Sequence, residues 1–168
     1  MALSGSIGRA IERHMAPFGV TFGRVARTAR PDEDVHGVDE LPDLLPYADV
    51  VVLVVPLTEQ TRGLVDARFL AAMKDGALLI NAARGPVVDT AALLTELATG
   101  RITAALDVTD PEPLPADHPL WGLPNVFLTP HTGGAVYGLL PRAYALVGDQ
   151  LRRYLSGAPL INLVVGGY

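Results

Sequence analysis

The 168-residue sequence contains no cysteine, no cluster of basic residues and no long apolar run. Without cysteine, the chain has no disulfide, no thiolate zinc ligand and no thiol nucleophile, and we predict no metal site. The formal charge of −5 argues against nucleic acid or an anionic membrane as partner. The longest apolar run, Val50 to Val55, ends at Pro56 and falls far short of the roughly 20 residues that span a bilayer.

The remaining composition fits a soluble globular protein, with 49% hydrophobic and 18% charged residues. A chain of this length is expected to form one domain with a sizeable core. The first residues, Met1 to Gly5, lack a basic segment followed by an apolar signal core. A cytoplasmic location is therefore expected.

Short apolar stretches alternate with helical ones, which predicts a parallel sheet covered on both faces. Asp89 is expected to cap a helix that Gly100 ends, and Pro141 to mark the first turn of the last helix. Helices are predicted at 6–18, 39–47, 67–73, 90–98 and 136–155, strands at 20–25, 50–55, 77–81, 103–108 and 126–129, and a polar loop at 31–37.

Three separated motifs each follow a predicted strand: Asn81–Gly85, Asp107–Pro113 and Thr129–Gly134. In an open α/β sheet, ligands bind beyond the carboxyl ends of the strands. The motifs therefore predict that an arginine (Arg84), a carboxylate and a histidine (His131) meet at one edge of the sheet.

In order, spacing and flanking residues these motifs resemble the D-isomer-specific 2-hydroxyacid dehydrogenases, which reduce 2-keto acids with a nicotinamide cofactor. The resemblance covers almost the whole chain and implies a Rossmann-like, doubly wound parallel sheet. It predicts a dinucleotide-binding domain over residues 1–157 and a tail over 158–168 that returns to a substrate domain. The comparison with the family further predicts that this substrate domain is mostly absent and the first strand largely missing, as in an N-terminally truncated member.

The sequence Gly5-Ser6-Ile7-Gly8 opens the first predicted helix. Glycines let the main chain approach a pyrophosphate, whose charge the amides and dipole of the helix start attract. Leu3 stands where the full fingerprint has another glycine, so an ordinary glycine start of a helix is the alternative. Only residues 2–4 precede Gly5 as a first strand. Three outcomes are open. These residues form a short strand that pairs with its neighbours, or another segment of the chain takes the place of the first strand, or the exposed apolar surface promotes self-association.

Comparison with the family brings Ala26 to the position where NAD-binding folds carry an acid for the ribose 2′-hydroxyl. An alanine there removes repulsion against a 2′-phosphate, and Arg27 or Arg30, flanking Thr28, would pair with it. This favours NADP over NAD, and solvated loop arginines are the alternative. Further on, Val55-Pro56-Leu57 and Thr61 resemble the family's turn beside the adenosine half of the cofactor, or simply a strand that a proline ends.

The resemblance assigns Arg84 to the carboxylate and keto oxygen of the substrate, which suits its planar fork of donors. It assigns Asp107 to the nicotinamide carboxamide, for which a carboxylate is a good acceptor. An ordinary surface arginine and an ordinary strand-end aspartate are the alternatives.

Glu112 and His131 are the implied proton-transfer pair. Histidine titrates near neutrality, and an adjacent carboxylate keeps it protonated and oriented. Protonated His131 would donate to the keto oxygen and take the proton back in the reverse direction. A solvent-exposed loop acid and a packed loop histidine are the alternatives. The implied cofactor contacts are Gly5, Ser6, Ile7, Gly8, Arg27, Thr28, Arg30, Val55, Pro56, Leu57, Thr61, Ala82, Ala83, Arg84, Asp107, His131, Gly133 and Gly134.

Three functions fit these residues. The first is an oxidoreductase acting on a small 2-keto or 2-hydroxy acid. The second is a nucleotide-binding or dimerisation remnant without turnover, and the third is a regulatory dehydrogenase-like protein whose assembly the cofactor controls. Because the family pairs subunits through its nucleotide domain, a homodimer is expected.

Overall fold

The computed structural model of the chain describes residues 2–3 and 5–163. The chain divides into two units, Met1–Pro130 and His131–Tyr168, which are described separately. The first unit contains the sheet and most of the predicted motifs. The second contains His131 and the last helix.

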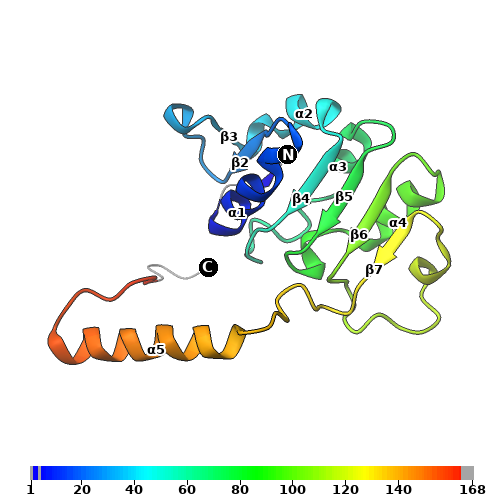
Figure 1. Cartoon of the computed structure of the whole chain (residues 1–168). Coiled ribbons are helices and arrows are strands. Elements are labelled where there is room, and N and C mark those ends of the chain that lie inside the picture. The colour runs from blue at the N-terminus through cyan, green and yellow to red at the C-terminus, as the bar shows by residue number, and fades with distance from the viewer. Residues whose placement is uncertain (1, 4, 164–168) are drawn as a thin grey trace. The chain divides into compact units, whose positions relative to one another are not determined.

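The first unit is built on a seven-stranded parallel sheet with the order β3-β2-β1-β4-β5-β6-β7 (Figure 1). The strands step outward from β1 in one direction as far as β3 and then in the other direction from β4 to β7. This is the doubly wound arrangement, so the predicted fold class is confirmed. The strands are β1 (Ala2–Leu3), β2 (Arg24–Ala26), β3 (Val35–Gly37), β4 (Val50–Leu53), β5 (Leu78–Asn81), β6 (Thr103–Leu106) and β7 (Val126–Leu128).

The two residues of β1 are enough to join the two halves of the sheet. Ala2 pairs with Arg24 of β2 and with Val52 of β4, and Leu3 pairs with Val25. Of the alternatives considered for the first strand, a short pairing by residues 2–3 is therefore the one that occurs. Ser4 lies outside the described residues.

The sequence prediction placed the start of β2 too early and missed β3. The second strand begins at Arg24, four residues later than expected, and the predicted polar loop at 31–37 contains a 3-10 turn, Pro31–Glu33, followed by β3. Val35 is buried and pairs with Arg24 in parallel register. A strand of three residues has too little alternation to be recognised from its own sequence, because its stability comes from the neighbouring strand.

The helices of the first unit are α1 (Ser6–Met15), α2 (Leu41–Leu44), α3 (Ala67–Ala72) and α4 (Thr90–Ala98). The connections between parallel strands are right-handed, and they run first in one direction along the sheet and then in the other. Connections in opposite directions place their helices on opposite faces of the sheet. Helix α1 therefore lies on one face, and α2 to α4 lie on the other. The predicted helix at 39–47 is confirmed in broken form, as a 3-10 turn, Val38–Glu40, then α2, then a second 3-10 turn, Leu45–Tyr47.

The hydrophobic core lies between the sheet and the helices α3 and α4. Every second residue of the central strands is buried there, and α3 and α4 contribute residues such as Leu70 and Leu97. Asp89 caps α4 by accepting from the main-chain N–H groups of Ala91 and Ala92, as predicted. Gly100, with φ of 74°, follows the helix end. The buried residues of β4, β5 and β6 are Val51, Leu53, Leu79, Asn81, Ala104 and Leu106.

The second unit carries α5, Leu139–Ser156, which begins three residues later than predicted. Pro141 is its third residue and lies in the first turn, which confirms the prediction. Gly138 and Gly157 flank the helix with positive φ values of 81° and 69°. Over residues 2–3 and 5–163, the helices include none that is long and apolar enough to cross a membrane.

Candidate functional site

Arg84 lies on a tight turn, residues 82–85, which follows β5 and is called the Arg84 turn here. Asn81, the last residue of β5, is only 1% exposed and holds both sides of this turn. Its Oδ1 accepts from the N–H of Ala83 at 3.0 Å, and its Nδ2 donates to the carbonyl of Arg84 at 3.1 Å. A buried amide that uses its donor and its acceptor in this way fixes the main chain that carries the guanidinium.

The Arg84 turn packs directly on the loop Asp107–Pro113, which follows β6. A Cβ atom added at Gly85 would lie 1.8 Å from the carbonyl oxygen of Thr109, so this approach requires glycine. Thr90, the first residue of α4, donates its hydroxyl to the carbonyl of Asp110 at 2.8 Å. Two motifs that lie far apart in the sequence therefore meet at the carboxyl edge of the sheet.

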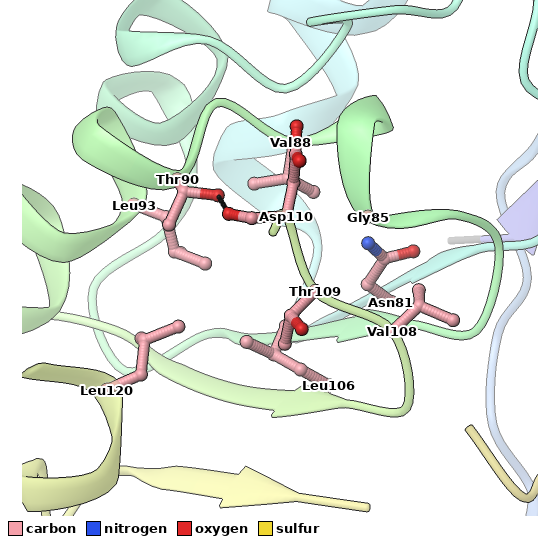
Figure 2. Close-up of a pocket in the computed structure, with 10 residues that line it drawn as sticks. All are labelled: Asn81, Gly85, Val88, Thr90, Leu93, Leu106, Val108, Thr109, Asp110 and Leu120. Atoms are coloured by element: carbon pink, nitrogen blue, oxygen red, sulfur yellow. Dashed lines mark hydrogen bonds between the residues drawn. The ribbon is translucent and has the colours of Figure 1, made fainter. Parts of the chain in front are cut away.

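A small cavity of about 230 Å³, which includes space open to solvent, lies between these loops and α4 (Figure 2). Its walls are mainly aliphatic, and Arg84, Asp107 and Glu112 do not line it. We therefore regard it as a packing space under the loops. The lining residues are Asn81, Gly85, Val88, Thr90, Leu93, Leu106, Val108, Thr109, Asp110 and Leu120.

The charged side chains of this edge are accessible. Arg84 and Glu112 are exposed, and Asp107 is half-buried. Arg84 donates from Nη1 to the carbonyl of Ala83 at 2.6 Å, and within residues 2–3 and 5–163 the other donors of its five-donor guanidinium are available to an anion. Asp107 accepts a hydrogen bond of 2.6 Å from the hydroxyl of Thr129, which follows β7.

The start of α1 leaves room for an anion. Gly5 is the N-cap of this 10-residue helix and makes no side-chain cap. A Cβ atom at Gly5 would meet no atom of the described residues within 4 Å, whereas Gly8 is buried. The first turn of a helix leaves amide donors without intrahelical partners, and the open space in front of Gly5 gives an anion access to them.

The residues predicted to read the 2′-phosphate lie just after β2. Arg27 and Thr28 are exposed, whereas Arg30 donates from Nε to Glu33 at 3.0 Å. Because Glu33 already neutralises Arg30, Arg27 is the better candidate for a phosphate. At the Pro56 turn, the hydroxyl of Thr61 donates to the carbonyl of Pro56 at 2.7 Å, so Thr61 shapes the turn itself.

His131 belongs to the second unit, with Gly133 and Gly134. All three residues are exposed, and His131 has a left-handed main chain with φ of 54°. The structure brings together Arg84 and the Asp107–Pro113 loop. The approach of His131 to them stays a prediction.

Sequence reasoning missed Asn81 and Thr129 as parts of this site. Both stand inside the quoted motifs, yet neither carries a charge and neither was given a role. An asparagine at the last position of a buried strand is a usable signal for Asn81, since a buried amide needs partners. Nothing in the sequence indicates that the Thr129 hydroxyl reaches Asp107.

These features define a dinucleotide-binding α/β domain, with a phosphate-accessible helix start and charged loops at the carboxyl edge of its sheet. Residues 4–133 match the model of the D-isomer specific 2-hydroxyacid dehydrogenase, NAD binding domain. The chain belongs to this family.

Similar proteins include the human glyoxylate reductase/hydroxypyruvate reductase, 40% identical over 161 residues that make up 93% of this chain and 49% of the human protein. The glyoxylate/hydroxypyruvate reductase B of Citrobacter koseri is 48% identical over 126 residues, 74% of this chain and 39% of that protein. The chain thus spans about half the length of the curated relatives it matches.

Among solved structures, a D-isomer specific 2-hydroxyacid dehydrogenase from Xanthobacter autotrophicus, crystallised with NADPH and MES, superposes with a TM-score of 0.85. The two sequences are 40% identical, and the superposition covers 98% of this chain and 69% of the other. The Sinorhizobium meliloti NADPH-dependent glyoxylate/hydroxypyruvate reductase, solved with NADP and sulfate, gives a TM-score of 0.84 at 31% identity, covering 97% of this chain and 54% of that one.

Proposed function

We propose that this chain is the dinucleotide-binding part of an NADPH-dependent oxidoreductase that interconverts small 2-keto acids and D-2-hydroxy acids. The observation that carries the proposal is the packing of Gly85 on Thr109. This contact places the Arg84 turn beside the Asp107–Pro113 loop, at the sheet edge where doubly wound folds bind their ligands. Membership of the family supports the same reading.

The chain's own residues fit the cofactor in three places. Residues 5–8 would hold the pyrophosphate at the start of α1. Arg27 and Thr28 would hold the 2′-phosphate, and Asp107 would accept from the nicotinamide carboxamide. When bound, the nicotinamide ring supplies or accepts the hydride.

Substrate binding and proton transfer would use the three charged residues of the motifs. Arg84 offers a fork of donors to the carboxylate and the keto oxygen of a 2-keto acid. His131 would donate a proton to the keto oxygen during reduction and remove it from the hydroxyl during oxidation. Glu112 would keep the imidazole protonated and oriented. Since the similar human and bacterial enzymes are named glyoxylate and hydroxypyruvate reductases, these two acids are the first substrates to test.

The domain limits of the proposal extend beyond the first compact unit. Residues 1–157 would form the dinucleotide-binding domain, with α5 included, and residues 158–168 would return to a substrate domain. Measuring the cofactor affinity of a chain that ends at residue 157, beside that of the full chain, would test these limits. A chain that ends at residue 157 should bind the cofactor as tightly as the full chain, and weaker binding would contradict these limits.

A second candidate is a nucleotide-binding remnant or regulatory protein without turnover. The chain covers 49% of the human reductase and 39% of the C. koseri enzyme, so cofactor binding and turnover have to be measured separately.

Fluorescence titration of the full chain with NADPH and NADH, followed by turnover of glyoxylate, hydroxypyruvate and pyruvate, separates these candidates. Turnover supports the enzyme, and binding without turnover supports the remnant. Failure to bind either cofactor contradicts both. Where turnover occurs, His131→Ala should abolish it with a much smaller effect on cofactor affinity, and activity that survives this change would overturn the proton-transfer role.

We further propose that the chain forms a homodimer. Within the second unit, α5 displays a row of exposed apolar side chains at alternating spacings of four and three residues, the pattern of a helix–helix seam. Sedimentation equilibrium should give twice the monomer mass, and a monomer at micromolar concentration would contradict the proposal. The row consists of Leu140, Tyr144, Val147, Leu151 and Tyr154.

A further inference from the structure

The hydrogen bond between Thr129 and Asp107 joins the ends of two neighbouring strands. Asp107 directly follows β6, and Thr129 directly follows β7. The strand ends are already held by main-chain bonds, from the N–H of Thr129 to the carbonyl of Leu106 at 3.0 Å and from the N–H of Asp107 to the carbonyl of Asn81 at 3.0 Å. The side-chain bond is therefore not needed to set the register of the strands.

The direction of this bond follows from chemistry. An ionised carboxylate only accepts, so the hydroxyl of Thr129 is the donor and Oδ1 of Asp107 is the acceptor. The O–O separation of 2.6 Å lies in the range of hydrogen bonds from a hydroxyl to a carboxylate, which are stronger than those between neutral groups. Both side chains are half-buried, so the bond is only partly screened by water.

Such a bond restricts rotation of the carboxylate. One acceptor site of Oδ1 is taken, and the bond limits the orientations of the group relative to the end of β7. A primary amide has two N–H donors and requires an acceptor in a defined position, whereas an apolar substituent gains nothing from it. A pre-oriented carboxylate therefore favours a ligand that carries an N–H₂ group.

We propose that Thr129 is a positioning residue for the cofactor, acting through Asp107 to select the carboxamide of the nicotinamide ring. The inference rests on the proposed function, since it requires that a nicotinamide dinucleotide binds at this edge. It goes beyond that function by giving the Thr129 hydroxyl, which follows the neighbouring strand β7, a part in the recognition of the nicotinamide carboxamide. Thr129 contributes orientation, and Asp107 makes the contact.

The test uses the full chain and three ligands: NADPH, its 3-acetylpyridine analogue, in which a methyl group replaces the amide N–H₂, and 2′-phospho-ADP-ribose, which lacks the ring. Thr129→Val removes the hydroxyl and keeps the shape of the side chain. We expect it to weaken NADPH binding about tenfold, the scale of one hydrogen bond to a charged group. Affinity for the other two ligands should change by less than about twofold.

Three further variants make the result specific. Thr129→Ser keeps the hydroxyl and should restore NADPH binding. Thr103→Val, at the amino end of β6, removes a strand hydroxyl far from this edge and should leave all three affinities unchanged. Asp107→Asn should weaken NADPH binding, and adding Thr129→Val to it should have little further effect, because the two residues act as one unit.

Equal weakening of all three ligands by Thr129→Val would show a merely structural role and overturn the inference. Unchanged NADPH binding in that variant would overturn it too, while leaving the proposed function intact. If the parent chain bound neither NADPH nor 2′-phospho-ADP-ribose, the proposed function itself would fail, and the inference with it.

Discussion

The Nδ2 atom of Asn81 lies 3.1 Å from the carbonyl oxygen of Arg84, and this bond closes the turn that presents the guanidinium. The opposite atom of the same amide, Oδ1, accepts from Ala83 at 3.0 Å. A neutral side chain that is 1% exposed therefore controls the position of an exposed charged one. This pair suggests a direct test of how the site is held.

Asn81→Asp should destabilise the protein. It replaces the Nδ2 donor with an oxygen that faces the carbonyl of Arg84, and it places a carboxylate in a buried position. We expect a loss of about 1–3 kcal/mol in the free energy of unfolding, measured by denaturant titration. Faster hydrogen exchange at the amide of Ala83 should accompany it. Gln60→Glu, the same chemical change at an exposed position, is the control, and an equal loss in both variants would contradict the clamp.

Gly85→Ala should be destabilising for a different reason. The added methyl group would lie 1.8 Å from the oxygen and 2.2 Å from the carbon of the Thr109 carbonyl, and main-chain atoms cannot move aside cheaply. Forced overpacking of this kind costs about 1–3 kcal/mol, and the Arg84 turn should separate from the Asp107–Pro113 loop. Thermal unfolding measures the first effect, and loss of NADPH affinity reports the second.

Gly122→Ala is the matched control, since a Cβ atom there meets no atom of the described residues within 4 Å. It should unfold at the same temperature as the parent. If Gly85→Ala behaved in the same way, the two loops would not be in contact in solution, and the basis of the proposed function would be lost.

The sequence predicted a parallel sheet covered on both faces and the strand ends that carry Arg84, Asp107 and Thr129, because these depend on local patterns. Apolar runs define the central strands, and a parallel arrangement brings their carboxyl ends to one edge. The cap at Asp89 and the first turn at Pro141 were predictable for the same reason. Each depends on residues within one turn of helix.

The remaining features depend on contacts between distant residues. Strand β3 exists because Val35 pairs with Arg24, and the Arg84 turn lies where it does because Gly85 meets Thr109. Periodicity carries no information about either contact. The carboxylate-hydroxyl bond between Asp107 and Thr129 is equally non-local, which explains why a reading of motifs assigned Asp107 a role and Thr129 none.

Arg27→Ala should reduce the affinity for NADPH and spare the affinity for NADH. Arg27 is exposed just after β2, and a charge-assisted hydrogen bond to a phosphate contributes about 1.5–3 kcal/mol, or about 10- to 150-fold in affinity. Arg30→Ala should have a smaller effect, because Glu33 holds Arg30 at 3.0 Å. Fluorescence titration with both cofactors measures these changes.

Glu33→Gln sharpens this test, because it removes the negative charge beside Arg30 and should tighten NADPH binding. Arg68→Ala, at an exposed position of α3, is the control for the loss of a positive charge. A parent chain that prefers NADH by a wide margin, or equal losses for both cofactors in Arg27→Ala, would contradict the assignment of the 2′-phosphate site.

The ion pair between Glu12 of α1 and Arg24 of β2 predicts a pH dependence of stability. The Arg24 guanidinium donates to the Glu12 carboxylate and holds the pKa of that carboxyl below its usual value. A carboxyl whose pKa is lower in the folded state contributes stability above its unfolded pKa, about 4.3, and that contribution is lost as the pH falls through the folded pKa. Glu12→Gln should therefore be less stable than the parent at pH 6, and the difference between their denaturation midpoints should disappear as the pH is lowered through this range.

Glu59→Gln, at an exposed position, should give no such trend. A midpoint difference that stays constant from neutral to acid pH would mean that the pair does not link α1 to the sheet in solution.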